Sequence, residues 1–206
     1  MSKKTPLKQF LMGTGRFEKL YDAICAVRSQ KITVNNEVMI NPNYFFNPRT
    51  SLVKFGDEKL MTVKKAYFIL NKPAGCICQK SIKEKSIYDL IKGLKIDDKL
   101  GMSLFSVGRL DRDTEGLLII TNDGKLSSHI TQPDYKIEKE YYAVLSKLIN
   151  HEDAKKIEDG IEIFINDVKY KTKPAKIKII GEKKLVISVS EGKKRQIRKM
   201  FEAIGN

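Results

Sequence analysis

The sequence predicts an α+β protein in which a small α/β domain precedes a larger domain with a mostly antiparallel, mixed sheet flanked by helices. First, strand patterns outnumber helix patterns and mostly follow one another along the chain. Second, 206 residues, 41% of them hydrophobic, suffice for a small and a medium domain. Third, the turn residues Gly56-Asp57-Glu58-Lys59 predict a domain boundary just after them, near 60–65. We therefore expect domains at 1–60 and 61–206.

The first domain is predicted to combine two helices with a hairpin. Phe17, Leu20, Ile24 and Val27 recur at helical spacing, and they predict a helix over 17–30 after a shorter one over 7–12. An Asn-Asn turn between two alternating segments predicts a hairpin. The expected strands are 31–34, 37–40 and 52–55, with a turn at 56–59.

The second domain is predicted mainly from apolar runs of strand length. The residues 117–121, LLIIT, are mainly apolar and include three β-branched side chains, the composition of a buried strand. The expected strands are 66–70, 76–78, 104–107, 117–121, 138–145, 161–165, 174–180 and 184–190. The expected helices are 87–91, 124–129, 151–159 and 194–204.

The chain is strongly basic, and the charge is not confined to a tail. Its formal charge is +14, and basic residues exceed acidic ones in each of the segments 1–60, 61–135 and 136–206. A distributed basic excess is typical of folded proteins that bind a polyanion, nucleic acid first. The alternative is a lysine-rich composition with no such partner.

Cysteine content and hydropathy indicate the compartment. Three cysteines are an odd number, which makes a disulfide framework improbable and favours a reducing cytoplasm. No apolar run has the length of a membrane span, and the basic N-terminus has too short an apolar stretch for a signal peptide. We expect a cytoplasmic protein without membrane association.

A cluster of charged residues directly precedes the buried strand at 117–121. Among them Asp111 is flanked by Gly108 and Gly116, which allow a tight turn and close approach of a ligand. Desolvating a carboxylate costs several kcal/mol unless it is paired or hydrogen-bonded. Asp111 is therefore either an ordinary aspartate that caps a solvated turn or an acid held at the edge of a cleft.

The last predicted helix begins with cations. Lys194, Arg195, Arg198 and Lys199 lie near its start, where the helix dipole prefers anions. Such an arrangement suggests that an anion, a phosphate or a carboxylate, is supplied from elsewhere. The alternative is a solvated basic face. The helix is expected to bury Ile197, Met200, Phe201 and Ile204.

Strand alternation predicts the orientation of Tyr141. Within 137–145 this tyrosine shares the more apolar face with Ala143 and Leu145. It is either an ordinary core tyrosine or an aromatic ring on which a base stacks.

The sequence predicts no metal or cofactor. Asp111 and Asp113 have the spacing of a Mg²⁺ pair but lack a third carboxylate at suitable spacing. Cys76 and Cys78 have no histidines at zinc-site spacing, so a structural role is expected. Nucleotide-binding and nucleophile-elbow motifs are absent from the sequence.

Four stretches together resemble a known family. They are GRLDRDTEGLLIITNDG at 108–124, KPAG at 72–75, EKEY at 138–141 and EGKKRQIRKMFEAIGN at 191–206. In order and spacing they are similar to the bacterial ribosomal RNA pseudouridine synthases of the RsuA/RluB/RluF group, over 61–206. RSQKITVNNEVM at 28–39 resembles the S-four-type RNA-binding domain that precedes the catalytic domain in this group. Family members usually continue through another strand, so we expect a truncated C-terminal end.

The resemblance implies roles for three residues. Asp111 is the implied catalytic aspartate, Tyr141 packs on the target base, and Arg198 pairs with Asp111. At about 4 Å and an effective dielectric of about 20, such a pair attracts by roughly 4 kcal/mol before desolvation. The candidate RNA contacts are Arg28, Lys31, Arg109, Lys194 and Arg195.

The implied function is isomerisation of a specific uridine in ribosomal RNA by a monomer that needs no cofactor. YKTKPAKIKII at 170–180 and the ending MFEAIGN favour the member that acts on 16S rRNA, as free RNA or as a pre-ribosomal small-subunit particle. Three routes stay open to Asp111: attack on the sugar, attack on the base, or removal of the C2′ proton. The alternatives are a large-subunit synthase of the group, a non-catalytic RNA-binding assembly factor, and a metal-dependent phosphodiesterase using Asp111 and Asp113.

Overall fold

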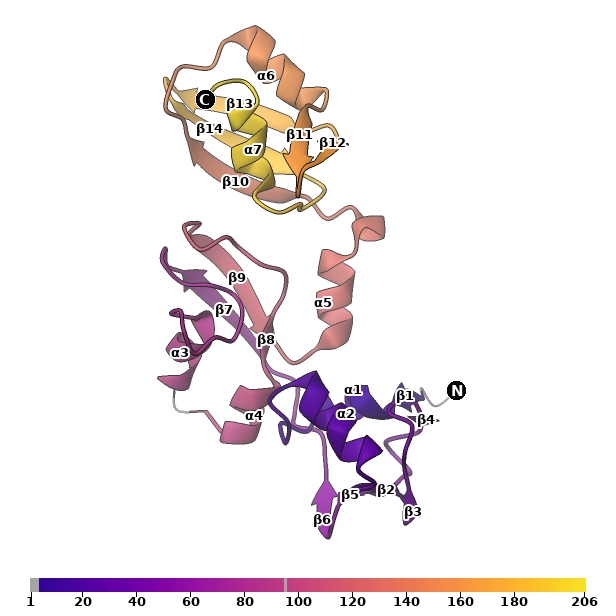
Figure 1. The fold of residues 1–206 in the computed structure, drawn as a ribbon. Coiled ribbons are helices and arrows are strands. Elements are labelled where there is room, and N and C mark those ends of the chain that lie inside the picture. The colour runs from indigo at the N-terminus through magenta and orange to yellow at the C-terminus, as the bar shows by residue number, and fades with distance from the viewer. Residues whose placement is uncertain (1–3, 95) are drawn as a thin grey trace. The chain divides into compact units, whose positions relative to one another are not determined.

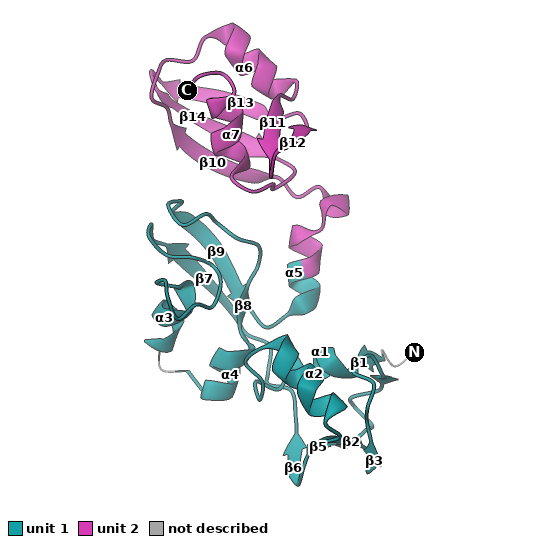
Figure 2. Cartoon of the chain, in the orientation of Figure 1, with its two compact units in different colours: residues 1–127 teal, residues 128–206 magenta. Residues whose placement is uncertain are grey.

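The computed structural model describes residues 4–94 and 96–206, and these form two compact units (Figures 1 and 2). Unit 1 lies within residues 1–127 and unit 2 comprises residues 128–206. Each named strand pairs antiparallel with its neighbours in the part of the chain that is described, and helices pack beside the sheets. The predicted α+β class is confirmed. None of the helices in the described ranges is long and apolar enough to cross a membrane.

The first part of unit 1 places two helices, α1 and α2, with a four-stranded sheet of order β3-β2-β5-β6 (Figure 1). Its buried apolar cluster draws only on residues between Leu7 and Leu60. Asn35 and Asn36 both have positive φ, as a two-residue hairpin turn requires. The elements are β1 Thr5–Pro6, α1 Leu7–Met12, α2 Leu20–Arg28, β2 Ile32–Val34, β3 Glu37–Val38, β4 Phe45–Phe46, β5 Val53–Phe55 and β6 Glu58–Leu60, with β1 paired to β4.

Two expectations in this part are corrected. The helix predicted from residue 17 begins at Leu20, because Lys19 has an extended backbone. The turn predicted over 56–59 is shorter, because Glu58 and Lys59 belong to β6 and pair with β5.

Close packing joins this part to the rest of unit 1. Gly15 has φ +65°, and a Cβ there would lie 1.9 Å from the carbonyl oxygen of Lys99 in α4, Asp98–Ser103. The Glu58 carboxylate forms ion pairs with Arg16 Nε at 3.0 Å and with Lys99 Nζ at 3.5 Å. The Gly13-Thr14-Gly15 segment is therefore a packing turn, and glycine is needed for both its φ and its close contact.

The second part of unit 1 is a three-stranded sheet of order β7-β9-β8. Its strands are β7 Tyr67–Lys72, β8 Phe105–Ser106 and β9 Gly116–Thr121, and α3 Ile87–Lys92 packs with it. The strand predicted at 76–78 is wrong: Ile77 makes only an isolated bridge to Ser86. Cys76 and Cys78 turn inward instead, and the Cys78 thiol bonds with the backbone N–H and carbonyl of Leu110 at 3.3 Å.

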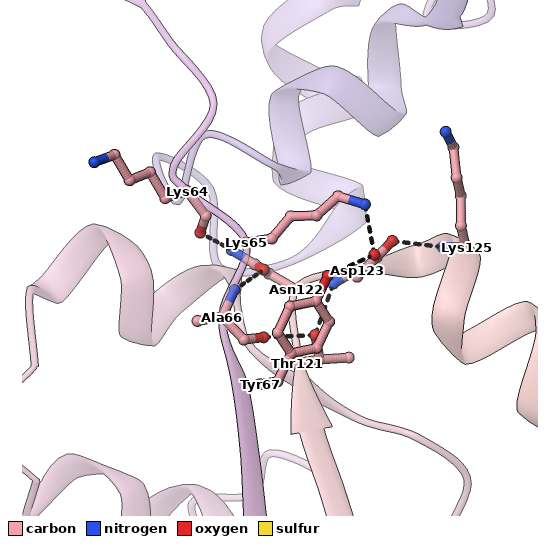
Figure 3. A network of polar contacts seen from close by, with 8 residues as sticks. All are labelled: Lys64, Lys65, Ala66, Tyr67, Thr121, Asn122, Asp123 and Lys125. Atoms are coloured by element: carbon pink, nitrogen blue, oxygen red, sulfur yellow. Dashed lines mark hydrogen bonds and ion pairs between the residues drawn. The ribbon is translucent and has the colours of Figure 1, made fainter.

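A polar network lies at the N-terminal end of helix α5, Gly124–Thr131 (Figure 3). Helix α5 begins in unit 1 and ends in unit 2 (Figure 2). Asp123 accepts hydrogen bonds from Lys65 Nζ at 2.5 Å, Tyr67 Oη at 3.0 Å and the Lys125 N–H at 3.1 Å. The Lys65 hydrogen bond, with smaller help from the others, outweighs desolvation and lowers the pKa of Asp123 to about 2.

Unit 2 is a three-stranded sheet of order β10-β14-β13 with a separate hairpin and two helices (Figure 1). Ile157 of one helix and Met200 and Phe201 of the other share a buried cluster with inward residues of β10 and β14. The elements are the 3-10 helix Pro133–Tyr135, β10 Lys139–Val144, α6 His151–Glu158, β11 Glu162–Ile165, β12 Val168–Lys171, β13 Lys176–Gly181, β14 Lys184–Val189 and α7 Gln196–Glu202.

Two differences from the sequence prediction occur in unit 2. The last helix begins at Gln196 and not at 194, because Arg195 is in the left-handed region with φ +53°. Strand β12 was not predicted, since its sequence VKYK is short and half lysine.

Candidate active site

Asp111 lies in a tight turn directly before β9. It is half-buried, and its carbonyl oxygen accepts a hydrogen bond from the Thr114 N–H at 3.1 Å. The flanking Gly108 and Gly116 have φ +75° and +117°, values that side chains other than glycine rarely adopt. The tight turn predicted from these glycines is confirmed.

A buried lysine holds the backbone of this turn through hydrogen bonds. Lys72, at the end of β7, is fully buried, and its Nζ donates to the carbonyl oxygens of Pro73 at 3.0 Å, Arg112 at 3.1 Å and Thr114 at 2.8 Å. The Arg112 carbonyl also accepts from the Gly75 N–H at 2.9 Å. A buried ammonium is tolerated only when its donors are satisfied, so the KPAG loop and the Asp111 turn are held together.

The other charges of the turn differ from Asp111 in exposure. Arg109, Arg112, Asp113 and Glu115 are all exposed, and Arg112 pairs with Glu84 at 3.5 Å. Asp111 is the partly shielded acid of the segment. No group of three or more His, Cys, Asp or Glu in the described ranges is placed to hold a metal ion.

Tyr141 on β10 has the orientation that alternation predicts. It packs against the buried cluster of unit 2 together with Ala143, while Tyr142 is 58% exposed on the opposite face. Its core contacts and a contact with a base are compatible, because a partly buried ring keeps an accessible part.

The basic segment before α7 is exposed at Lys193, Lys194 and Arg195, and Arg198 is exposed on the helix. Lys199 differs, because it is half-buried and its Nζ donates to the carbonyl oxygen of Phe164 in β11. The first four are available to a polyanion, whereas Lys199 is engaged within unit 2.

A buried carboxylate lies beneath this basic segment. Glu191 accepts hydrogen bonds from Tyr170 Oη at 2.5 Å, from the Lys173 N–H at 3.0 Å and from Gln196 Nε2 at 2.7 Å. The hydrogen bond to Glu191, aided by desolvation, raises the pKa of Tyr170 to about 12. Through Gln196, this carboxylate is linked to the first residue of α7.

Neither Lys72 nor Glu191 is among the residues that the sequence predicted as functional. The sequence nevertheless holds a signal for both, because each occupies the next inward-facing position in a pattern of alternate residues. Lys72 follows Phe68 and Leu70 of β7, and Glu191 follows Ile187 and Val189 of β14.

The predicted site residues form three local groups. Arg109 and Asp111 share the turn of unit 1. Arg28, the last residue of α2, and Lys31, directly before β2, are both exposed. Unit 2 carries the remaining four. Asp111 belongs to unit 1 and Arg198 to unit 2, and their pairing stays a prediction. A basic chain with a half-buried aspartate on a hydrogen-bonded turn and a group of exposed cations has the parts of an enzyme that acts on a polyanion.

Comparison with known proteins identifies the family. The model of the RNA pseudouridylate synthase family matches residues 66–203. The chain is 33% identical to the ribosomal small subunit pseudouridine synthase A of Haemophilus influenzae, over 88% of this chain and 75% of that protein. The Vibrio cholerae protein of the same name is 32% identical over 95% of this chain and 80% of its own length. A pseudouridylate synthase crystal structure superposes with a TM-score of 0.64 and 32% identity, over 97% of this chain and 83% of that one.

The chain belongs to the RNA pseudouridylate synthase family and is therefore an enzyme that isomerises uridine in RNA to pseudouridine.

Proposed function

We propose that this enzyme modifies one uridine of ribosomal RNA, in the 16S RNA of the small subunit. The observation that carries the proposal is the similarity to synthases named for the small ribosomal subunit, which extends over 87–95% of the chain. The basic excess of the chain supports an RNA substrate of this size. The substrate is the free RNA or a pre-ribosomal small-subunit particle, and the enzyme acts as a cytoplasmic monomer.

The reaction needs no change of oxidation state. The N1–C1′ bond of uridine breaks, the base turns, and C5 bonds to C1′; the C5 hydrogen is released and N1 gains a proton. We assign the carboxylate role in this exchange to Asp111. Its half-buried position on a turn whose backbone is held by Lys72 supports the assignment, because a restrained backbone reduces the free energy spent on orienting a reacting group.

The two other proposed catalytic-site residues belong to unit 2. Arg198 supplies the counter-charge of Asp111, and Tyr141 packs on the target base. Taking a base out of its stack costs a few kcal/mol, and an aromatic partner returns about 1–3 kcal/mol. The exposed guanidinium of Arg198 and the half-buried ring of Tyr141 support these roles.

RNA outside the target base is held by cations. We propose that residues 1–60 act as an S-four-type RNA-binding domain through Arg28 and Lys31, and that Arg109, Lys194 and Arg195 contact phosphates. All five side chains are exposed, which supports contact with the backbone of the RNA.

The test is a map of pseudouridines in total rRNA from cells with and without the gene. The proposal predicts that one position of 16S rRNA loses its pseudouridine and that re-expression restores it. Loss of a 23S position would identify a large-subunit enzyme. An unchanged map with defective particles would identify an assembly factor. A phosphodiesterase would instead cleave RNA and stop in EDTA, whereas pseudouridine formation is expected to continue.

A further inference from the structure

We propose that Glu191 is a positioning residue for the active site: its buried carboxylate fixes the segment 193–198 that presents Lys194, Arg195 and Arg198. The inference rests on the proposed role of Arg198 and deepens it. It is carried by the hydrogen-bond network of Glu191, Gln196, Tyr170 and Lys173.

Each oxygen of Glu191 has a separate task. One oxygen accepts from the Tyr170 hydroxyl at 2.5 Å and so joins the segment to β12. The other accepts from the Lys173 N–H at 3.0 Å and from Gln196 Nε2 at 2.7 Å. Glu191 itself follows β14, whose inward residues lie in the core. The carboxylate therefore ties the first residue of α7 to two strands.

Gln196 transmits this restraint to the loop. Its Oε1 accepts from the Lys193 N–H at 2.9 Å, and its own N–H donates to the Lys193 carbonyl at 3.1 Å. Lys194 and Arg195 lie between these two contacts, and Arg195 is held in the left-handed region. The Arg195 carbonyl accepts a hydrogen bond from the Lys199 N–H at 3.0 Å, which is the first i to i+4 hydrogen bond of helix α7. Lys193 adds a cation–π contact, with Nζ 4.7 Å from the centre of the Tyr170 ring.

The loop has a reason to need such an anchor. Lys193, Lys194, Arg195 and Arg198 repel one another, and a left-handed non-glycine residue is a strained choice. Without Glu191, the Gln196 amide and the Tyr170 hydroxyl would lose a buried acceptor, which is costly. We propose that Glu191 acts through the geometry of its hydrogen bonds and not through its charge alone. A neutral residue of the same shape should therefore preserve its function.

Two substitutions separate geometry from charge. Glu191→Gln keeps an oxygen for Lys173 and Gln196, and its amide nitrogen can donate to the Tyr170 hydroxyl oxygen. Glu191→Ala removes every bond. In single-turnover assays of the full chain at saturating 16S rRNA, Glu191→Ala should lower the rate by at least about 30-fold, because misplacement of a reacting group by about 1 Å can cost about 100-fold. Glu191→Gln should stay within about 3-fold of wild type.

A matched control excludes a general stability effect. Ile157→Ala in α6 removes a fully buried side chain from the same core but leaves every contact of Glu191 in place. It should cost about 2–5 kcal/mol of stability and leave the rate of the folded enzyme within about 2-fold. If it slows the reaction as much as Glu191→Ala, or if Glu191→Gln is as slow as Glu191→Ala, the positioning role is refuted.

Hydrogen exchange gives a readout that does not need activity. The amides of 193–199 should exchange at least about tenfold faster in Glu191→Ala and at the wild-type rate in Glu191→Gln. Tyr170→Phe loses only the hydroxyl and should raise the exchange rate of these amides by a smaller factor. This variant provides the test if Glu191→Ala does not fold. Unchanged exchange in both would overturn the inference. A wild-type enzyme that forms no pseudouridine would refute the proposed function, while the exchange measurement would still decide the role of Glu191.

Discussion

The turn before β9 and the loop before α7 each present charged side chains, and each is held by a buried residue of the opposite charge. The first presents Asp111 and rests on the buried cation of Lys72, which donates to three carbonyl oxygens. The second presents a group of cations and rests on the buried anion of Glu191, which accepts from an O–H, an N–H and an amide.

The difference shows what a buried charge does in a loop. Lys72 has only donors, so it binds carbonyl groups and fixes backbone directly. Glu191 has only acceptors, so it reaches the backbone of its loop mostly through the side chain of Gln196. The Asp111 turn is therefore fixed by direct contacts, and the basic loop is fixed by a relay.

The strongest test of this comparison is Lys72→Met. The substitution keeps an apolar stem and removes the donor that the carbonyl oxygens of Pro73, Arg112 and Thr114 share. We expect a loss of about 2–4 kcal/mol in the free energy of unfolding and at least about a 100-fold slower reaction in the protein that remains folded. Urea unfolding and single-turnover kinetics measure the two effects. Wild-type kinetics in Lys72→Met would show that the turn does not need this anchor.

Arg198 and Lys199 provide the next test, because they are adjacent yet differ in environment. Arg198→Met should lower the single-turnover rate by at least about 100-fold if it serves Asp111 as proposed. Lys199→Met should lose its hydrogen bond to Phe164, cost about 1 kcal/mol of stability and leave the rate within about 5-fold. The reverse order of sensitivity would assign the functional cation to Lys199.

Acid unfolding tests the Asp123 network at the start of α5. The pKa of Asp123 is lowered to about 2, so the carboxylate stabilises the folded state above its ordinary value of 3.8. This contribution is lost as the pH falls from about 4 to about 2. Because Lys65 is half-exposed and solvent screens the pair, Asp123→Asn should cost only about 1 kcal/mol at pH 7 and flatten stability between pH 4 and 2. An unchanged pH profile of urea unfolding in Asp123→Asn would contradict this.

The smallest expected effect concerns RNA contacts in the first 60 residues. Removing a phosphate contact lowers the slope of log K against log[salt] by about one unit. The double substitution Arg28→Gln and Lys31→Gln should therefore reduce the slope by about one to two units. Lys155→Gln, which removes a cation paired with Asp159 at 3.2 Å on α6, is the control and should leave the slope unchanged. Equal slopes for all three proteins would mean that Arg28 and Lys31 do not contact the RNA backbone.

Periodicity predicted much of the fold correctly. The strands predicted at 117–121 and 184–190 are present as β9 and β14, with Leu118, Ile120, Leu185 and Ile187 in the core. The expectation of a strand buried on both faces at 117–121 is wrong, because alternate residues face outward and Leu117 is 69% exposed. Local patterns were sufficient because each of these strands turns alternate apolar residues toward the core.

The anchors were not predicted because charged residues are usually exposed, and an alternation that ends in Lys72 or Glu191 looks like the end of a strand. The start of α7 was misplaced because nothing in the local sequence shows that Arg195 is left-handed, with φ +53°. The pairing of Asp111 with Arg198 rests on the family resemblance alone, since no local pattern links segments so distant in the sequence.

The central claim, that Asp111 performs the isomerisation, is tested most directly by release of the C5 hydrogen from 16S rRNA labelled at C5 of uridine. Asp111→Asn keeps the shape of the side chain and removes its charge, and Asp113→Asn makes the same change at an exposed position of the same turn. We predict no detectable release by Asp111→Asn, release within about 3-fold of wild type by Asp113→Asn, and wild-type unfolding and RNA affinity for both. Release by Asp111→Asn at a rate near wild type would contradict the account.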